Sequence, residues 1–236
     1  MKIPPKFLHR LIYRVSVLRN ILAYCVNVFQ LQLLGFYKDK NVIRLISSTK
    51  KEVDFLFSPD EAFIIYSIAK AQSILEGDMA EVGVFQGGSA RLICEAKGKR
   101  KLHLFDTFRG LEKVSNVDTH FGGIRFWREK EFSKVDLESV REYLSRYDNV
   151  FLYPGEFPAT GDPIKHARFS FVHLDADLYT STLASLQFFY PKLISGGIIL
   201  CHDYHSDGIK RAFGEFFKDS MKPIIELPSS QCIVVK

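Results

Sequence analysis

Four ionisable residues in the C-terminal third of the chain could together bind a metal ion or move a proton. Asp175 and Asp177 follow one apolar run, and His202 and Asp203 follow the next. If these runs are neighbouring parallel strands, their carboxyl ends lie about 5 Å apart. Three carboxylates at that spacing repel one another unless a cation joins them or one stays protonated with a raised pKa. Asp175 and Asp203 are therefore candidate ligands of a hard cation such as Mg²⁺.

Asp177 or His202 could complete the ligand set, and His202 has a second possible role. A neutral imidazole can ligate a metal, although a nitrogen donor shifts the preference from Mg²⁺ toward transition ions. The same ring could be the general base that removes a hydroxyl proton near neutral pH. We expect His173 to lie in the core and His205 to be exposed. As a purely structural alternative, Asp177 and Asp207 would cap the helices that follow them.

Residues 79–90 form the second candidate site. A run of small and branched residues stops there at a glycine pair that ends with Gly88, and a helical pattern begins directly after it. This strand, turn and helix arrangement is where open α/β sheets bind cofactors, and Gly83 and Gly88 would let a ligand approach the backbone. Glu81 would repel the pyrophosphate of a dinucleotide. The stretch therefore favours an amino acid-like cofactor that carries a positive charge.

Asp106 follows the glycine pair at the end of another apolar run. It lies about 20 residues beyond the turn, where a carboxylate can accept hydrogen bonds from the hydroxyls of a ribose. Taken alone, the residue could equally cap a helix. Together with Glu81 and the glycines, the ribose interpretation is favoured.

These residues can meet only if one edge of a sheet carries them, and the remaining sequence predicts such a sheet. Apolar runs predict strands over residues 80–84, 101–105, 150–153, 169–174, 196–201, 224–225 and 232–235, and helical periodicity predicts helices over 58–75, 90–97, 136–147, 179–190 and 207–217. The first of these helices has a well-formed start at Ser58-Pro59-Asp60-Glu61. The last two strands must pair antiparallel, because only a short turn joins them. Segment 107–135 fits neither period, and irregular segments of that length are usually functional or disordered.

Composition indicates one full-sized domain. With 236 residues, of which 47% are hydrophobic, the chain can bury a complete core. Its four cysteines are far apart in the sequence and form no CxxC pair. This spacing argues against a cysteine zinc site and favours a reducing, cytoplasmic setting.

Basic charge is concentrated in residues 1–51, which hold ten Lys or Arg and one acid, a net charge of +9. The rest of the chain holds 22 basic and 26 acidic residues, a net charge of −4, which argues against a nucleic-acid function for the main body. Residues 7–37 are strongly apolar, yet their Asn and Gln make a poor membrane span. We expect a helical arm that packs on the domain or on a second subunit, or that lies on a membrane with Arg10, Arg14 and Arg19 at anionic head groups.

Four motifs, taken in order, resemble those of a known family. They are Glu81 to Ser89, Phe105 to Leu111, Leu174 to Tyr179, and Gly196-Gly197 leading to His202-Asp203-Tyr204. Over residues 52–236 the chain resembles the macrocin-type (TylF/MycF/NovP-like) sugar O-methyltransferases of the class I S-adenosylmethionine-dependent superfamily. The resemblance implies an α/β, Rossmann-like fold with a seven-stranded, mostly parallel sheet and one antiparallel strand, preceded here by the N-terminal helical arm of residues 1–51.

The resemblance also implies where a cofactor and a metal would bind. S-adenosylmethionine would lie over the glycine turn, with Glu81 at its methionine end, Asp106 at its ribose and loop 153–157 at its adenine. The cofactor-contacting set would be Glu81, Gly83, Phe85, Gln86, Gly88, Ser89, Asp106, Thr107, Gly155, Phe157 and Asp175. Family members hold Mg²⁺ with aspartates at positions that correspond to 175, 202 and 203. This chain has a histidine at the second of them, so its metal set would be Asp175, His202 and Asp203.

The implied reaction is transfer of a methyl group to a hydroxyl of a sugar, glycan or glycolipid, with Asp175 and His202 as catalytic residues. Segment 107–135 would form the lid and acceptor pocket, where Phe121, Phe126 and Trp127 could stack on a ring. Two alternatives stay open: a metal-free transferase that uses His202 as base, and a non-catalytic, membrane-associated scaffold that keeps the cofactor. A homo-oligomer and a membrane-peripheral location are further expectations.

Overall fold

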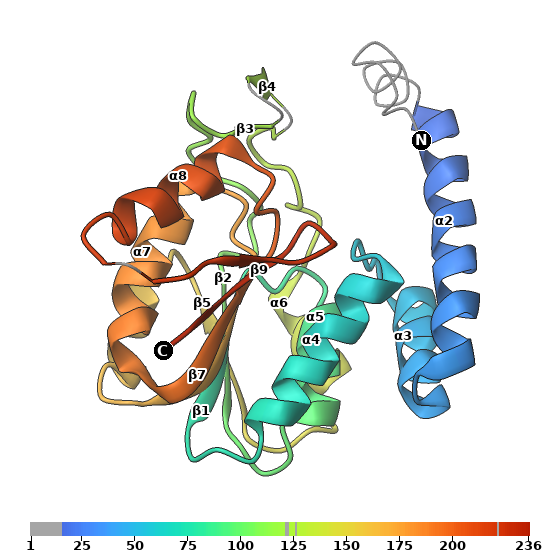
Figure 1. Cartoon of the computed structure of the whole chain (residues 1–236), viewed down its shortest axis with the longest axis horizontal. Coiled ribbons are helices and arrows are strands. Elements are labelled where there is room, and N and C mark those ends of the chain that lie inside the picture. Colours follow the sequence, from blue (N-terminus) through green and yellow to red (C-terminus); the bar gives the residue numbers. More distant parts are fainter. Residues whose placement is uncertain (1–15, 121–122, 126, 221) are drawn as a thin grey trace.

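A seven-stranded sheet forms the centre of the molecule, with the strand order β5-β2-β1-β6-β7-β9-β8 (Figure 1). The computed structural model describes residues 16–120, 123–125, 127–220 and 222–236. The strands of this sheet are β1 (Asp78–Val82), β2 (Leu102–Asp106), β5 (Val150–Pro154), β6 (Phe169–Leu174), β7 (Leu193–Cys201), β8 (Ile225–Glu226) and β9 (Cys232–Val235). β9 runs antiparallel to both of its neighbours, and the other six strands share one direction. The predicted sheet and its one reversed strand are confirmed.

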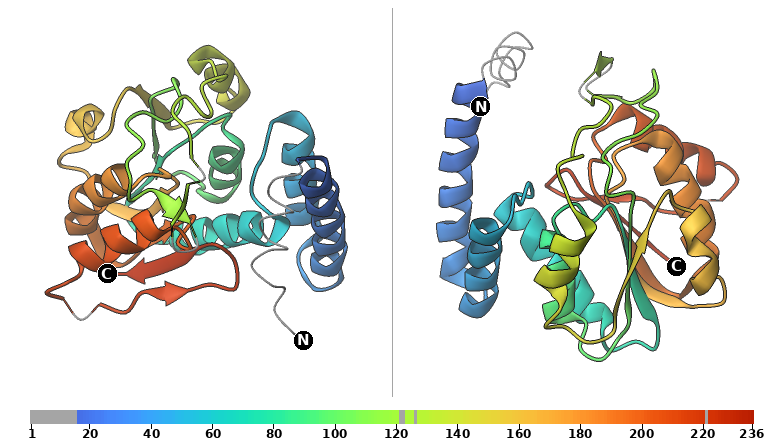
Figure 2. Two further views of the ribbon diagram at one scale, coloured as in Figure 1. Left: turned by 90° about the horizontal axis from the view of Figure 1, so that it is seen from above. Right: turned by 180° about the vertical axis from the view of Figure 1, so that it is seen from behind.

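Helices cover both faces of the sheet (Figures 1 and 2). The helices of the described residues are α2 (Ser16–Tyr37), α3 (Lys40–Glu52), α4 (Pro59–Gln72), α5 (Gly88–Ala96), α6 (Leu137–Leu144), α7 (Tyr179–Phe189) and α8 (Asp207–Phe216), with the 3₁₀ turns η1 (Ala159–Ile164) and η2 (Tyr190–Lys192). The described part of segment 107–135 is irregular apart from a short hairpin of β3 (Thr119–His120) and β4 (Ile124–Arg125). This segment lies above the carboxyl ends of the strands, where the sequence predicted a lid.

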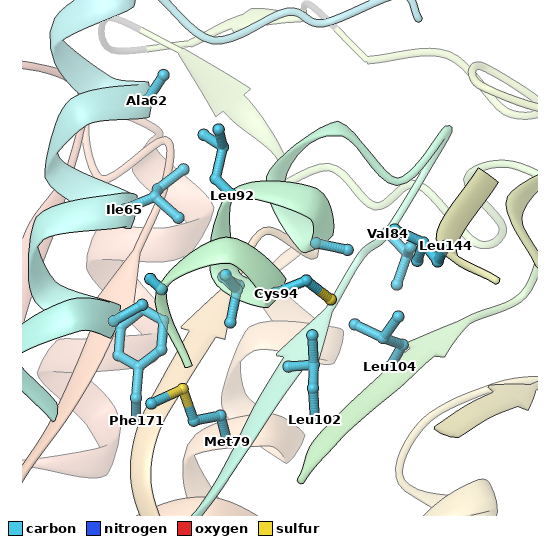
Figure 3. Packing of buried hydrophobic residues seen from close by; sticks show 14 of the residues in the cluster. Ala62, Ile65, Met79, Val84, Leu92, Cys94, Leu102, Leu104, Leu144 and Phe171 are labelled. Atoms are coloured by element: carbon cyan, nitrogen blue, oxygen red, sulfur yellow. The ribbon is translucent and has the colours of Figure 1, made fainter. Parts of the chain in front are cut away.

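Two hydrophobic clusters hold the layers together. On one face, Ile65 of α4 and Leu92 of α5 pack toward Met79 and Phe171 of the sheet (Figure 3). On the other face, the cluster is built from α7, α8 and the strands around Val172. Each large apolar side chain that is fully buried stabilises the fold by about 1.5–3 kcal/mol. The two clusters therefore fix the strand ends from both sides.

The two helices before residue 53 differ in their contacts. α3 belongs to the first cluster, because its Ile46 is fully buried and Val42 nearly so. α2 stands at the outer edge of the molecule beside α3 (Figure 2), and most of its described side chains are exposed. Within the described ranges, none of the helices has the length and apolar character needed to cross a membrane.

Two predicted helix caps are wrong. The N–H of Tyr179, at the start of α7, donates to Asp118 Oδ1 at 2.7 Å, so Asp118 takes the place expected for Asp177. The cap position of α8 is Ser206. Asp207 Oδ2 instead accepts hydrogen bonds from Thr119 Oγ1 at 2.8 Å and from the backbone N–H of residue 123 at 3.1 Å. Contacts from the distant segment 107–135 displaced the local caps in both cases.

Candidate active site

A cleft of about 560 Å³ opens at the carboxyl ends of the central strands. Its wall is formed by the glycine turn after β1, the residues that follow β2, β5, β6 and β7, part of segment 107–135, and residues 54–57. Eight carboxylates line it: Asp54, Asp106, Glu112, Glu131, Glu156, Asp175, Asp177 and Asp203. No lysine or arginine lines the described part of this wall, where His202 is the one basic side chain. Glu112 and Glu156 pair with Arg109 and Lys113 outside this lining, and the remaining carboxylates attract cations and repel phosphate groups.

The glycine turn is held by Asp106 from the neighbouring strand. Asp106 Oδ2 accepts the N–H of Val84 at 2.7 Å and of Phe85 at 2.9 Å, and Oδ1 accepts the N–H of Phe108 at 2.7 Å. Gly83 has φ +87°, and a Cβ atom there would collide with the backbone carbonyl of Asp175. Its lack of a side chain therefore lets β1 and β6 approach each other. Asp106 lines the cleft as predicted for a ribose partner and also fixes the turn.

Nine of the eleven predicted cofactor residues line the cleft: Gly83, Phe85, Gly88, Ser89, Asp106, Thr107, Gly155, Phe157 and Asp175. Glu81 and Gln86 do not. Glu81 is fully buried behind the turn, where its Oε1 lies 2.7 Å from His173 Nδ1. The side chain of Gln86 pairs with Asp54, whose backbone N–H donates to it at 2.8 Å. Burial raises the pKa of Glu81, and the hydrogen bond to His173 only partly offsets that rise.

The predicted acidic cluster lies at the ends of the adjacent strands β6 and β7, which pair Leu174 with Cys201. His202 Nδ1 is 3.2 Å from Asp175 Oδ1 and 3.3 Å from Asp203 Oδ1. The candidate ligand atoms of these three residues all lie within 4.8 Å of one another. The structure therefore brings together the three residues that the sequence singled out.

The other nitrogen of His202 faces two residues that the sequence did not single out. His202 Nε2 lies 3.0 Å from Ser230 Oγ and 3.4 Å from Glu61 Oε1. Ser230 Oγ donates to the same Glu61 oxygen at 2.5 Å. In the sequence Glu61 belongs to a helix start, and its Oε2 does accept the N–H of Ser58 at 2.9 Å. That local role gave no signal of its contact with His202.

Charge shifts the titration of this cluster. Burial alone would lower the pKa of His202, but Asp203 and Asp175 raise it well above its ordinary value. Burial would raise the pKa of Glu61, and hydrogen bonding and the positive charge of His202 lower it instead. Burial and the charges of Asp175 and Asp203 raise the pKa of Asp177. One of the crowded carboxylates thus has the raised pKa that the sequence predicted.

The donor set fits a divalent cation. Two carboxylates and one imidazole nitrogen converge, and the partners of His202 Nε2 leave Nδ1 to face Asp175 and Asp203. Metal-bound histidines usually donate their other N–H to a carboxylate or a similar acceptor. The nitrogen donor suits transition ions better than Mg²⁺.

Aromatic side chains form the opposite wall. Trp127 lines the cleft, with its ring centroid 5.7 Å from that of Phe132, and Phe132 lies 5.2 Å from Phe85. Trp127 is placed where a ring platform was expected, whereas Phe121 and Phe126 lie outside the described residues.

The predicted exposure of His205 is wrong, because it is half-buried beneath the β3–β4 hairpin. Its Nε2 is 3.0 Å from His120 Nδ1, and its Nδ1 is 3.8 Å from Asp203 Oδ1. The hairpin is a long-range contact, so the local sequence around His205 gave no sign of it. His205 therefore lies at the edge of the acidic cluster.

Residues 54–57 close the cleft from the N-terminal side, a role that the sequence did not indicate. The Phe57 ring meets the His202 ring edge-on, with centroids 4.6 Å apart. Lys50, in the last turn of α3, donates to the carbonyl of Phe57 and, at 3.4 Å, to that of Phe55. Burial lowers the pKa of Lys50 to about 8, although Glu61 and Asp60 counteract it. Lys50 thus links α3 to the cleft wall.

Residues 65–228 match the family described as Macrocin-O-methyltransferase (TylF). The chain is 32% identical over 151 residues to the 8-demethyl-8-(2,3-dimethoxy-alpha-L-rhamnosyl)-tetracenomycin-C 4'-O-methyltransferase of Streptomyces olivaceus, covering 59% of this chain and 58% of the relative. It is 30% identical over 139 residues to the demethyldecarbamoylnovobiocin O-methyltransferase of Streptomyces niveus, covering 54% and 53%. The chain thus spans little more than half the length of these relatives. The O-methyltransferase NovP has a similar fold, with a TM-score of 0.61 and 24% identity over 77% of this chain and 81% of NovP.

Proposed function

The chain belongs to the macrocin O-methyltransferase (TylF) family, and from that premise we propose that it transfers a methyl group from S-adenosylmethionine to a hydroxyl of a sugar or glycan. The observation that carries this proposal is the lining of the cleft. Eight carboxylates and no described lysine or arginine surround a glycine turn at the carboxyl ends of the strands. That surface suits a cofactor with sulfonium and ammonium charges and disfavours one with a pyrophosphate.

The residues that line the cleft have distinct proposed roles toward this cofactor. The N–H groups at the start of α5, beside Gly88 and Ser89, suit its carboxylate. Asp106 faces the ribose while it holds the turn, and Gly155 and Phe157 border the adenine. Phe157 can act as a fixed wall, because it stacks on Phe189 of the core with ring centroids 5.1 Å apart.

Methyl transfer needs the acceptor hydroxyl held in line with the methyl group and its proton removed as the new bond forms. We assign the holding to Asp175, His202 and Asp203 around a divalent cation, which would polarise the hydroxyl and lower its pKa. Asp175 is the proposed acceptor of the proton. His202 is less suited to that task, because both of its nitrogens already face carboxylate or hydroxyl partners.

The test uses the purified full chain, S-adenosylmethionine and a panel of aryl rhamnosides and free sugars. We expect S-adenosylmethionine to raise the melting temperature and an acceptor to release S-adenosylhomocysteine together with a methylated product. Activity that survives exhaustive EDTA treatment would favour the metal-free alternative. A thermal shift with S-adenosylmethionine but no methylated product from any acceptor would favour the scaffold alternative, and absence of any thermal shift would contradict both.

A second proposal concerns α2, whose outward face we assign to contact with an anionic lipid surface. Ile21, Phe29, Leu33 and Phe36 are exposed at helical spacing, with Phe29 66% and Phe36 86% exposed. Residues 1–51 carry a net charge of +9, which complements anionic head groups and would repel a second copy of the same arm. A glycan or glycolipid acceptor and a cytoplasmic, membrane-peripheral location would agree with this contact.

Flotation with vesicles tests the lipid assignment. We expect the protein to float with phosphatidylcholine vesicles that contain phosphatidylserine, and to float less with phosphatidylcholine alone or at high salt. If as much protein is found in the floating fraction without vesicles as with them, the assignment is contradicted. A dimer that dissociates when α2 is altered would assign the face to a homo-oligomer instead.

A further inference from the structure

The environment of His202 differs on its two sides. Toward the cleft, Nδ1 lies among Asp175 and Asp203, and away from the cleft, Nε2 lies against Ser230 and Glu61. We infer that Glu61 and Ser230 hold the His202 ring so that Nδ1 is committed to a metal, and that the site therefore prefers a transition divalent ion such as Mn²⁺ or Co²⁺ over Mg²⁺. The inference rests on the proposed function, because it concerns the cation that would assist methyl transfer.

The hydrogen-bond pattern selects the ring nitrogen. A neutral imidazole has one N–H and one lone pair. The Ser230 hydroxyl donates its proton to Glu61 Oε1 at 2.5 Å. Ser230 Oγ is then free to accept the N–H of His202 Nε2 at 3.0 Å. Nδ1 is thereby left facing two carboxylate oxygens 3.2 and 3.3 Å away. A cation among these three atoms would take the place of the proton on Nδ1 and accept its lone pair.

Glu61 is itself fixed by the fold. Its side chain is nearly buried, and both of its oxygens are used. Oε2 accepts the N–H and the hydroxyl of Ser58, at 2.9 and 2.6 Å, in the first turn of α4. Oε1 accepts the N–H of Ser230 at 3.2 Å. The Phe57 ring packs edge-on against His202, so the imidazole is oriented before any ligand binds.

The selectivity follows from the donor types. Mg²⁺ prefers oxygen ligands in octahedral geometry and keeps several waters. An imidazole nitrogen raises the affinity for first-row transition ions, and the affinity for Co²⁺ is higher than that for Mn²⁺. We therefore expect Mn²⁺ and Co²⁺ to bind at least about tenfold more tightly than Mg²⁺.

The experiment measures metal affinity by calorimetry on the EDTA-stripped full chain, without S-adenosylmethionine or acceptor. Glu61→Gln and Ser230→Ala should each weaken Co²⁺ binding by about 10- to 100-fold. Ser58→Ala is the matched control, because it removes the hydroxyl donor to Glu61 Oε2 and leaves both the backbone N–H of residue 58 and the contacts of Oε1 with Ser230 and His202. It should lower the melting temperature without changing Co²⁺ affinity. Ser230→Ala keeps the test open if Glu61→Gln does not fold, since it leaves the helix cap intact.

Spectroscopy adds a readout of the ligand itself. Bound Mn²⁺ should show nitrogen hyperfine coupling in its electron spin-echo spectrum, and His202→Asp should abolish that coupling and shift the preference toward Mg²⁺. Mg²⁺ that binds as tightly as Mn²⁺, or a bound Mn²⁺ without nitrogen coupling, would overturn the inference. Equal Co²⁺ affinities in Ser230→Ala, Glu61→Gln and Ser58→Ala would overturn the role of Glu61 and Ser230.

The outcomes separate this inference from the proposed function. Intact metal selectivity without any methyl transfer would refute the function and leave the metal inference standing. Methyl transfer that survives EDTA in a protein that binds no metal would refute the metal inference alone.

Discussion

In the cleft, charged side chains gather where the fold partly shields them from water. On α2, by contrast, large apolar side chains face outward and Asn27 and Gln30 lie on the less exposed side. His202 has partners on both nitrogens, whereas Phe36 is 86% exposed. Buried polar groups and exposed apolar patches are the two departures that carry functional information, because single exposed apolar residues are common.

The two regions therefore require different partners. The crowded carboxylates of the cleft lower their repulsion by binding a cation or a cationic ligand, and their geometry is fixed by neighbouring strands. The face of α2 gains free energy only by burying apolar area, and the helix is held by few buried residues. Changes in the cleft should thus alter chemistry or folding strongly, and changes on α2 should alter association while leaving the fold intact.

The largest effect is expected at Asp175. Asp175→Ala removes the proposed proton acceptor and one metal ligand, so turnover should fall by about 10³-fold or more. Cofactor binding should remain measurable as a thermal shift with S-adenosylmethionine. Glu138→Ala, on the exposed surface of α6, is the control for removal of a carboxylate. Unchanged turnover in Asp175→Ala would remove this residue from the mechanism.

Gly83→Ala tests whether the cleft is as rigid as its contacts imply. A Cβ atom there meets the carbonyl of Asp175 in a backbone with φ +87°, so the free energy of unfolding should fall by about 3 kcal/mol. Gly98→Ala has the same kind of backbone, φ +59°, with nothing within 4 Å of the added atom, and should cost about 1 kcal/mol. Denaturant unfolding measures both, and equal losses would show that β1 and β6 can move apart.

Substitutions on α2 should have a smaller effect than those in the cleft, and they should alter vesicle binding rather than turnover or folding. Phe29→Ser with Phe36→Ser removes two exposed rings and should reduce partition to anionic vesicles by about tenfold or more. The free energy of unfolding should change by less than about 0.5 kcal/mol. Ile74→Ser removes an apolar side chain that is 81% exposed outside α2, and it should leave vesicle binding unchanged. Equal vesicle binding by all three proteins would remove α2 as the lipid contact.

The same contrast explains what the sequence could predict. Asp175 and His202 each follow an apolar run, so strand periodicity and the adjacency of β6 and β7 were enough to bring them together. The mostly parallel sheet with one reversed strand followed from the same pattern and from the resemblance to a known family, whereas the strand order came only from the structure. Motif spacing also placed Asp106 beside the glycine turn, where it lies.

Long-range partners were beyond local reasoning. Glu61 and Ser230 meet across 169 positions, and the helix start offered a sufficient local reason for Glu61. Asp118 bonds the N–H of Tyr179 from 61 positions away, which overrode the cap predicted for Asp177. The helix start at Glu61 was predicted correctly and the cap at Asp177 was not, and in both cases a tertiary contact decided the partner.

Lys50 links α3, the neighbour of α2, to the cleft wall, and its titration distinguishes two ways in which α3 could hold that wall. Its pKa is lowered to about 8 in the folded protein from an ordinary 10.5, because burial disfavours the charged form. Between these values the unfolded chain binds more protons than the folded one, so stability should rise with pH through that window. Between about pH 7 and about pH 10, the free energy of unfolding of the wild type should therefore rise by on the order of 1 kcal/mol relative to that of Lys50→Met, after allowance for solvent screening.

Urea unfolding of both proteins at the two pH values measures this gain, with Lys51→Met as the control for the substitution in the same turn. If the stability of the wild type rises relative to Lys50→Met, the buried charge of Lys50 destabilises the fold. The carbonyls of residues 55 and 57 then require a hydrogen-bond donor but not a positive charge. An advantage of the wild type that shrinks as pH rises would mean that the charge itself anchors the wall. α3 would then stabilise the cleft wall electrostatically through Lys50.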